Sequence, residues 1–337
     1  MSSSLSLDPL INDPLLTRVP LEHEATFYPY GFPVRIRSNS VTTLEAADRS
    51  WSTYRRRYNY VPLDIRLALS QSRSPGCVEQ PTFRSQGHLL SIVVDRENFA
   101  SLDLNAGFAF GWATEATAQN QEYFRQCLLD VMVYPLLEVR HLITLHAACV
   151  IYQGKGILLA GNSGAGKSSL SYACARRGWT FVSDDASAFE RNAADPKVIG
   201  HPQKFRFREP VGDLFPEFRG LTSSIRAYGK PTIEVRTRTI EHIRGAEEGP
   251  VDAIVFLNRP AHKSGPPILI PLSVAEAWSR LSFSVWAVQM PAFEERLAAL
   301  ERLLAVPIYE IRYSELDPAI DLLEHYLAEH LIKELRD

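Results

Sequence analysis

A glycine-rich loop set between a short apolar run and a helical pattern is the feature that most constrains this chain. Residues 161–168 read GNSGAGKS and match the whole phosphate-loop pattern G-x-x-x-x-G-K-[ST]. The apolar residues 156–160 before the loop predict a strand, and the periodicity of residues 168–177 after it predicts a helix. In such a unit, unpaired backbone N–H groups and the helix dipole bind anionic phosphate. The agreement of motif, strand and helix disfavours a chance match in a glycine-bearing turn and predicts a nucleotide-phosphate site in an α/β domain.

Each position of the loop has its own expected task. The glycines at 161, 164 and 166 permit backbone angles and a close approach that a Cβ would block. Lys167 is expected to reach the β- and γ-phosphates, and the Ser168 hydroxyl is the expected Mg²⁺ ligand. Ser169 either assists or is an ordinary serine of the first helical turn, and we favour the second interpretation. The expected nucleotide-binding set is Gly161, Asn162, Ser163, Gly164, Ala165, Gly166, Lys167, Ser168 and Ser169.

Two adjacent aspartates close the next predicted strand. Residues 179–182 are aromatic and β-branched, and Ser183, Asp184 and Asp185 follow them. Since functional groups gather at the carboxyl ends of strands in open α/β sheets, we expect these carboxylates near the phosphate loop. Bound Mg²⁺ would relieve their mutual repulsion, and one carboxylate could accept a proton from an incoming hydroxyl. The alternative is a solvated turn or a helix cap, which we consider weaker beside a phosphate loop.

A longer pattern links a histidine, the loop and the paired aspartates. The chain reads HAACV from His146, GKGILLAGNSGAGKSSL from Gly154 and ARRGWTFVSDD up to Asp185. This pattern resembles the C-terminal catalytic domain of the HPr kinase/phosphorylase family. The resemblance implies that Lys167 and Ser168 bind ATP and Mg²⁺. It also implies that Asp184 is the general base for a protein serine and that Asp185 supports metal and substrate binding.

The neighbourhood of this pattern leaves three questions open. His146 either lies close to the same site or is a buried structural histidine. The family usually has acidic residues where this chain has Asn162 and Ser169, so metal coordination should differ. Residues 233–236 are only weakly similar to the family's Glu-Ile-Arg-Gly signature. Within them, Glu234 is either a metal ligand or, as we favour, a strand surface residue. The missing signature predicts a forward kinase with little or no phosphorylase activity.

The rest of the chain divides into three expected parts. Residues 1–114 carry short alternating runs broken by turn residues, which predict a mostly antiparallel, β-rich N-terminal domain. Residues 115–139 predict an amphipathic linking helix. Residues 140–337 complete the P-loop, HPr-kinase-like catalytic domain, with a buried strand at 251–259. The expected fold class is therefore α/β, with a P-loop catalytic domain preceded by a β-rich domain.

Two arginines in an alternating pattern lie after the aspartates. Residues 205–209 alternate as a strand and place Arg206 and Arg208 on the same side. Two arginines on one face could stabilise a transferring phosphoryl group, or they could form a solvated strand face, which we slightly favour.

Composition narrows the function classes. The 337 residues carry a net charge of −3, which argues against general nucleic-acid binding; the basic and aromatic residues 54–60 fit a solvated surface better than a base-stacking site. The four cysteines lie at positions 77, 127, 149 and 174. They show no C-x-x-C spacing, which favours reduced, cytoplasmic thiols. The N-terminal sequence lacks a signal-peptide pattern, and no segment approaches the ~20 apolar residues of a membrane span.

These patterns together predict an ATP-dependent phosphotransferase. We expect a serine (hydroxyl) kinase that uses ATP and Mg²⁺ and acts on a small protein or peptide, with Asp184, Asp185 and Lys167 as the catalytic residues and Ser168 and Asp185 at the metal. One alternative is a kinase for a small metabolite or a biosynthetic peptide. Another is a nucleotide-sensing regulatory module with little turnover. Neither a nucleic acid nor a membrane is an expected partner, and assembly into a homo-oligomer is left open.

Overall fold

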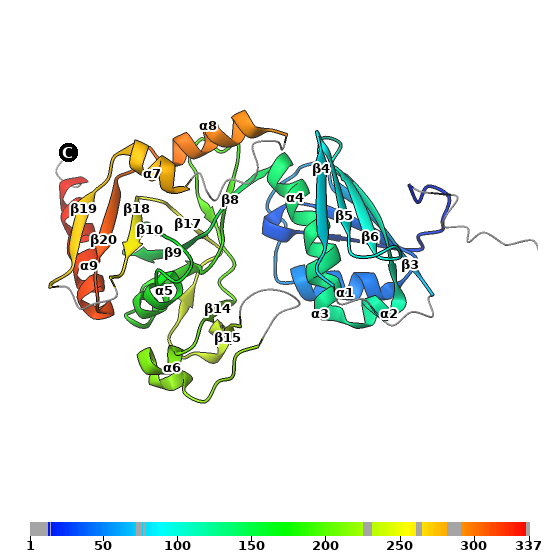
Figure 1. Ribbon diagram of the computed structural model, residues 1–337. Coiled ribbons are helices and arrows are strands. Elements are labelled where there is room, and N and C mark those ends of the chain that lie inside the picture. The colour runs from blue at the N-terminus through cyan, green and yellow to red at the C-terminus, as the bar shows by residue number, and fades with distance from the viewer. Residues whose placement is uncertain are drawn as a thin grey trace, which may run out of the picture. The chain divides into compact units, whose positions relative to one another are not determined.

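The protein contains two compact units of structure. The computed structural model describes residues 13, 15–71, 76, 79–224, 231–260, 265–281 and 291–334. Within this part of the chain, the first unit runs to Arg140 and also takes residues 291–292, and the second unit takes the remaining residues from His141 onward. Figure 1 shows the elements of both units. The domain boundaries expected from the sequence remain predictions.

The first unit is built on one seven-stranded sheet. Its strand order is β1-β2-β3-β7-β6-β5-β4. The pairs β2–β3 and β3–β7 are parallel, whereas the other four pairs are antiparallel. The expected β-rich and mostly antiparallel character of this region is therefore confirmed. The strands are β1 (His23–Phe27), β2 (Val34–Ser38), β3 (Leu63–Ser70), β4 (Thr82–Gln86), β5 (Leu89–Val93), β6 (Phe99–Asp103) and β7 (Phe108–Thr114).

Helices pack against the strands of this sheet. Helix α1 (Val41–Trp51), which the sequence analysis did not identify, begins after the N-cap Ser40 and packs against β1 and β2. The region 115–139 is not one continuous helix. It forms α2 (Glu115–Gln119), α3 (Gln121–Phe124), a π-helical turn (Arg125–Leu129) and α4 (Asp130–Arg140). The first break occurs because Asn120 leaves the helical conformation and its side chain caps α3 through the Tyr123 N–H.

The basic and aromatic segment 54–60 packs onto its own unit. The ring of Tyr58 stacks on buried Phe32 with a centroid distance of 4.0 Å, and the ring of Tyr60 lies 5.7 Å from the same phenylalanine. These aromatic rings therefore contribute to packing, as the surface interpretation requires.

The second unit is built on a second seven-stranded sheet. Its order is β16-β11-β9-β10-β18-β20-β19. Strands β10, β18 and β20 are parallel neighbours, while β9 is antiparallel to both β10 and β11. The strands expected at 156–160, 179–182 and 251–259 all form. The bounds are β9 (Ala147–Tyr152), β10 (Lys155–Ala160), β11 (Thr180–Ser183), β16 (Arg244–Gly245), β18 (Ala253–Asn258), β19 (Ile268–Pro271) and β20 (Ile308–Arg312).

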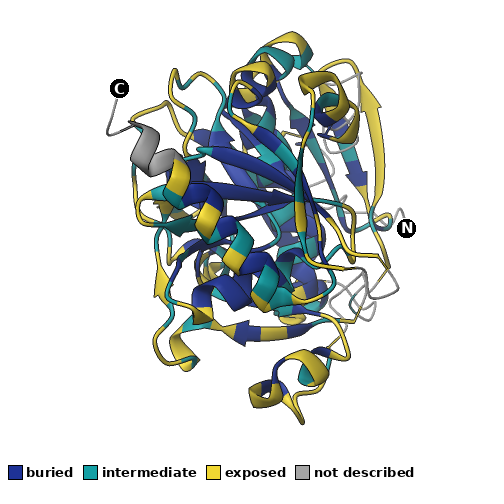
Figure 2. Cartoon of the chain, turned by 90° about the vertical axis from the view of Figure 1, so that its left-hand side faces the viewer, coloured by how far each residue is buried: buried dark blue, intermediate teal, exposed yellow. Residues whose placement is uncertain are grey.

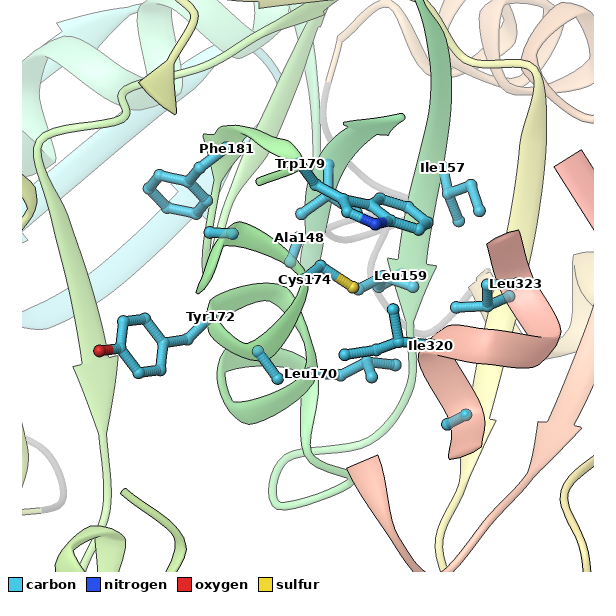
Figure 3. Packing of buried hydrophobic residues seen from close by; sticks show 14 of the residues in the cluster. Ala148, Ile157, Leu159, Leu170, Tyr172, Cys174, Trp179, Phe181, Ile320 and Leu323 are labelled. Atoms are coloured by element: carbon cyan, nitrogen blue, oxygen red, sulfur yellow. The ribbon is translucent and has the colours of Figure 1, made fainter. Parts of the chain in front are cut away.

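Two apolar layers cover the two faces of this sheet. Because side chains alternate along a strand, Leu159 of β10 contributes to one buried cluster and Leu158 to the other. The first cluster includes residues of α5 (Lys167–Arg176) and α9 (Leu316–Glu334), and Figure 3 shows Leu170, Cys174, Ile320 and Leu323 within it. The second includes residues of α7 (Val274–Leu281) and α8 (Phe293–Leu303). The central strands are buried, whereas the helices carry exposed outer residues (Figure 2).

Two smaller sheets complete the second unit. One is four-stranded, with the order β17-β13-β12-β8. The other is the hairpin of β14 (Lys204–Phe207) and β15 (Ile233–Arg236), whose Phe205 and Phe207 pack in the first apolar cluster. The remaining elements are β8 (Leu142–Leu145), β12 (Ser187–Glu190), β13 (Val198–Ile199), β17 (Glu248–Gly249) and α6 (Val211–Leu214).

The cysteines contribute to packing. Cys127, Cys149 and Cys174 are buried. Burial raises the thiol pKa of Cys149 and of Cys174, so the reactive thiolate is disfavoured at both. Cys77 lies outside the described residues. No helix in the described part of the chain is both long and apolar enough to cross a membrane.

Packing of α8 against the sheet gives a test of the fold. Leu300 is fully buried in the second apolar cluster, while its neighbour Glu301 is exposed. We expect Leu300→Ala to lower the free energy of unfolding by about 2–5 kcal/mol, because it removes buried methyl groups and leaves a cavity. Urea denaturation of the full chain measures this change. Glu301→Ala is the matched control and should change stability by less than about 0.5 kcal/mol; equal effects of the two variants would contradict the packing described.

Candidate functional site

Three strand ends meet at one edge of the sheet of the second unit. Because β9 is antiparallel to both neighbours, its first three residues lie level with the last residues of β10 and β11. Ala160 pairs with Ala147, and Ser183 pairs with Cys149. The phosphate loop, the residue before β9 and the paired aspartates therefore leave the sheet at the same edge. This position agrees with the expected carboxyl-end site.

The phosphate loop has the backbone conformation that its glycines permit. The φ angle is 92° at Gly164 and 100° at Gly166, values that L side chains rarely adopt. A Cβ at Gly166 would also lie 2.8 Å from the hydroxyl oxygen of Tyr313. Helix α5 begins immediately afterwards at Lys167. The first free N–H groups of that helix are thus available to phosphate oxygens.

Lys167 is held inside the loop. Its side chain is buried, and its Nζ donates hydrogen bonds to the carbonyl oxygens of Gly161 at 2.8 Å and Asn162 at 3.3 Å. Burial lowers the pKa of the Lys167 amine, whereas the carboxylates of Asp185 and Asp184 act in the opposite direction. The ammonium group is therefore positioned where phosphate oxygens could replace two loop carbonyls.

Asp184 is a buried carboxyl group at the end of β11. Its Oδ2 accepts a 2.6 Å hydrogen bond from the backbone N–H of Arg206, while its buried Oδ1 makes no hydrogen bond with any described residue. Burial raises the Asp184 pKa to about 7, and the negative charge of Asp185 adds to this effect. The Arg206 N–H and the nearby Ser168 hydroxyl favour the charged form, although Ser168 makes no hydrogen bond of normal geometry to Oδ1.

These donors fit a magnesium ion. An unpartnered carboxylate oxygen near a serine hydroxyl offers the oxygen ligands that Mg²⁺ prefers. Within the described residues, no group of three or more His, Cys, Asp and Glu side chains forms a closed metal site. Mg²⁺ would therefore take its remaining ligands from water and from nucleotide phosphates, as it commonly does.

Asp185 and His146 lie at the rim of the site. The His146 side chain is 44% exposed, which excludes the buried-histidine interpretation. Its Nδ1 lies 3.2 Å from Asp185 Oδ1 and 2.9 Å from the Asp185 carbonyl oxygen. The other Asp185 carboxylate oxygen, Oδ2, lies 3.6 Å from Arg206 Nη1. The half-exposed Asp185 carboxylate thus faces a histidine and an arginine at a surface that an acceptor could reach.

The β14–β15 hairpin brings further charged residues to the site. Glu234 forms ion pairs with Lys204 at 2.7 Å and with Arg206 at 3.2 Å. Its position on the strand surface agrees with the interpretation we favoured from the sequence. Arg208 follows β14 and its Nη2 donates a 2.6 Å hydrogen bond to Ser163 Oγ in the phosphate loop. Both arginines therefore contact the edge where the loop and the aspartates meet, and Arg208 is also exposed to solvent.

Tyr313 is a site residue that the sequence did not reveal. It is fully buried after β20, and its hydroxyl makes a long, 3.4 Å hydrogen bond to the Ala165 carbonyl oxygen. Burial raises its pKa to about 12, so it remains a neutral donor. No local sequence pattern identifies this residue, because the contact between residues 313 and 166 depends on tertiary structure.

Comparison with known proteins identifies part of the second unit. Residues 138–222 match the family model described as HPr Serine kinase C-terminal domain. Putative HPr kinase/phosphorylase 2 of Oceanobacillus iheyensis is 31% identical over 96 residues, which are 28% of this chain. The matched region spans only 30% of that relative.

A solved structure is also similar in part. The HPr(Ser) kinase/phosphatase structure from Coxiella burnetii shows 13% sequence identity and a TM-score of 0.34. The comparison covers 57% of this chain and 92% of that chain. The family model covers the motif pattern from His146 to Asp185. Residues 138–222 are therefore similar to the HPr Serine kinase C-terminal domain, as the motif pattern indicated.

Proposed function

We propose that this protein is an ATP-dependent phosphotransferase that phosphorylates a serine hydroxyl on a small protein or peptide. The match of residues 138–222 to the HPr Serine kinase C-terminal domain supports a kinase-like function. The observation that carries the proposal is the convergence of Lys167, Ser168 and the paired aspartates at one sheet edge. This convergence supplies the parts that phosphoryl transfer needs: a phosphate cradle, a cation, a site for Mg²⁺ and a proton acceptor.

The two aspartates would divide two tasks. The sequence resemblance gives Asp184 as general base and Asp185, with Ser168, as the metal residue. The burial of Asp184 and its free Oδ1 near Ser168 instead favour Asp184 as the metal ligand. The exposed Asp185 carboxylate, beside His146, is better placed to meet an acceptor hydroxyl. We therefore propose that the tasks are exchanged relative to the resemblance.

The proposed reaction needs little covalent chemistry from the protein. The acceptor oxygen forms a bond to the γ-phosphorus as the bond to the β–γ bridging oxygen breaks and ADP leaves. The hydroxyl proton passes to the carboxylate of Asp185. Lys167 binds and stabilises the phosphate charge, and bound Mg²⁺ would neutralise further charge on the phosphates.

The acceptor distinguishes this proposal from its alternatives. The same nucleotide site would serve a small-metabolite kinase or a kinase for a biosynthetic peptide. A nucleotide-sensing module with little turnover would use the loop without transfer, and Asn162 and Ser169 are the departures that favour it. Measuring ADP release from ATP with candidate proteins, peptides and metabolites separates these functions. Acceptor-dependent release with proteins or peptides supports our proposal, whereas release only with metabolites or none contradicts it.

Lys167 provides the first test. We expect Lys167→Ala to weaken Mg²⁺–ATP binding and to reduce transfer by roughly 10²-fold or more, because the loop cation is lost. Calorimetric titration and an ADP-release assay measure the two effects. Lys197→Ala removes an exposed lysine of the same unit and is the matched control. Unchanged affinity and turnover in the Lys167 variant would contradict the assignment.

The paired aspartates provide the second test. Asp184→Asn should raise the Mg²⁺ concentration needed for half-maximal transfer, because it removes a charged metal ligand. Asp185→Asn should leave that concentration unchanged and lower the turnover number at saturating Mg²⁺ by roughly 10²-fold, because the proton acceptor is lost. A metal titration of both variants measures this split. The opposite pattern would restore the assignment given by the resemblance, and normal turnover in both would show a structural role.

The raised pKa of Asp184 predicts a pH-dependent stability difference. Between the ordinary pKa of 3.8 and the folded value of about 7, the folded chain holds a proton that the unfolded chain has lost. This group's contribution to stability therefore falls as pH rises from about 4 to 7, by up to about 4 kcal/mol. The Asp184→Asn variant has no carboxyl group at this position, so its stability does not fall for this reason as pH rises.

Denaturation with EDTA present measures the effect. The stability of the Asn variant relative to the original chain should increase from pH 4.5 to pH 8 and then level off. Asp195→Asn, at an exposed position of the same unit, is the control and should give a constant difference. A constant difference for the Asp184 variant would contradict the buried, unpartnered carboxyl.

A further inference from the structure

Arg206, in β14, and Arg208, just after it, have partners of different charge. The Arg206 guanidinium lies 3.2 Å from Glu234 and 3.6 Å from Asp185, and the Arg206 backbone N–H binds Asp184. The Arg208 guanidinium binds the neutral hydroxyl of Ser163. The positive charge of Arg206 is thus balanced by carboxylates, whereas Arg208 has no carboxylate within ion-pair distance among the described residues.

Arg208 lies over the phosphate loop itself. Its Nη2 is 2.6 Å from Ser163 Oγ, and its Nη1 is the nearest atom to a Cβ built at Gly164, at 4.0 Å. The charge of Arg208 also acts to lower the pKa of Lys167. Two cations therefore approach the loop from different elements, Lys167 from α5 and Arg208 from the end of β14.

The partners of these two cations differ in how much they neutralise them. Lys167 is enclosed by loop carbonyl oxygens, whereas Arg208 is exposed and holds a single hydroxyl oxygen. A guanidinium group matches the geometry of a phosphate group and gains more from an anion than from a neutral hydroxyl. The Ser163 contact holds the side chain near the loop and leaves its charge available.

The connection to the aspartates indicates which phosphate Arg208 meets. Arg208 is two residues from Arg206, whose backbone N–H is fixed to the Asp184 carboxylate. The same short segment therefore contacts Asp184 through Arg206 and the phosphate loop through Arg208, so a terminal phosphate directed from the loop toward the aspartates would be within reach of Arg208. The α- and β-phosphates are expected to take the loop N–H groups.

We propose that Arg208 exchanges Ser163 for the γ-phosphate of ATP and is the residue through which this site distinguishes ATP from ADP. The inference rests on the proposed function. Arg208 binds and stabilises the transferring group and neither gives nor takes a proton. Arg206 has a different task, which is to hold the acid pair and Glu234 in place.

Calorimetric titration of the full chain tests this assignment. The probes are ADP and the β,γ-imido analogue of ATP, each with Mg²⁺. For Arg208→Gln we expect the dissociation constant of the triphosphate analogue to rise by roughly 10- to 100-fold, while that of ADP changes by less than about threefold. Arg238→Gln removes an exposed arginine just after β15 and controls for the general loss of positive charge. Equal losses for both nucleotides, or no loss for either, would overturn the inference.

A further variant tests the geometry of the phosphate contact. The affinity of Arg208→Lys for the triphosphate analogue should lie between those of the original chain and the Gln variant, since lysine keeps the positive charge but lacks the paired N–H donors of a guanidinium group. If Arg208→Gln does not fold, a normal ATP preference in Arg208→Lys overturns the inference and a reduced preference supports it.

Failure of this inference is distinguishable from failure of the proposed function. An original chain that binds neither nucleotide contradicts both. An original chain that prefers the triphosphate, with the same preference in Arg208→Gln, contradicts only the role of Arg208.

Discussion

The buried carboxyl group of Asp184 is the constraint on which the rest of the candidate site depends. One of its oxygens fixes the β14–β15 hairpin to the end of β11 through the Arg206 N–H. The other oxygen is buried and unpartnered among the described residues. Burying such a group costs free energy, which is why the Asp184 pKa rises to about 7. The fold tolerates this cost at the place where a divalent cation would remove it, as is common for groups that bind metal or take part in catalysis.

A chain of contacts extends from this group across the site. Arg206 connects Asp184 and Asp185 to Glu234, and His146 closes the rim on the other side of Asp185. These five residues come from the ends of β9 and β11 and from the β14–β15 hairpin, so their relative positions depend on strand pairing and not on one local segment. This arrangement explains why a site of few residues needs most of the second unit to hold it.

Local sequence signals were sufficient for the strands and for the loop. The apolar runs at 156–160 and 251–259 predict buried strands, and the glycine spacing predicts the loop conformation, because both depend on residues close in sequence. The meeting of the aspartates with the loop followed from the rule for strand carboxyl ends. The insertion of β9 between β10 and β11 could not be predicted, since antiparallel pairing is decided by distant contacts. The contacts of Arg208 with Ser163 and of Tyr313 with the loop are non-local in the same way, whereas the break at Asn120 had a local signal that the helical periodicity outweighed.

The contact between Tyr313 and Gly166 has a consequence for how this domain can be divided. The family match ends at residue 222, yet the tyrosine that fills the space beside the loop glycine lies 91 positions further along, after β20. Strands β18 and β20, which continue the parallel sheet from β10, also lie beyond the match. The motif-bearing segment and the C-terminal segment are therefore coupled by packing, because a Cβ at position 166 would lie 2.8 Å from the Tyr313 hydroxyl oxygen. Transferring the phosphate loop alone into another protein would therefore transfer the glycines without the tyrosine that packs beside Gly166.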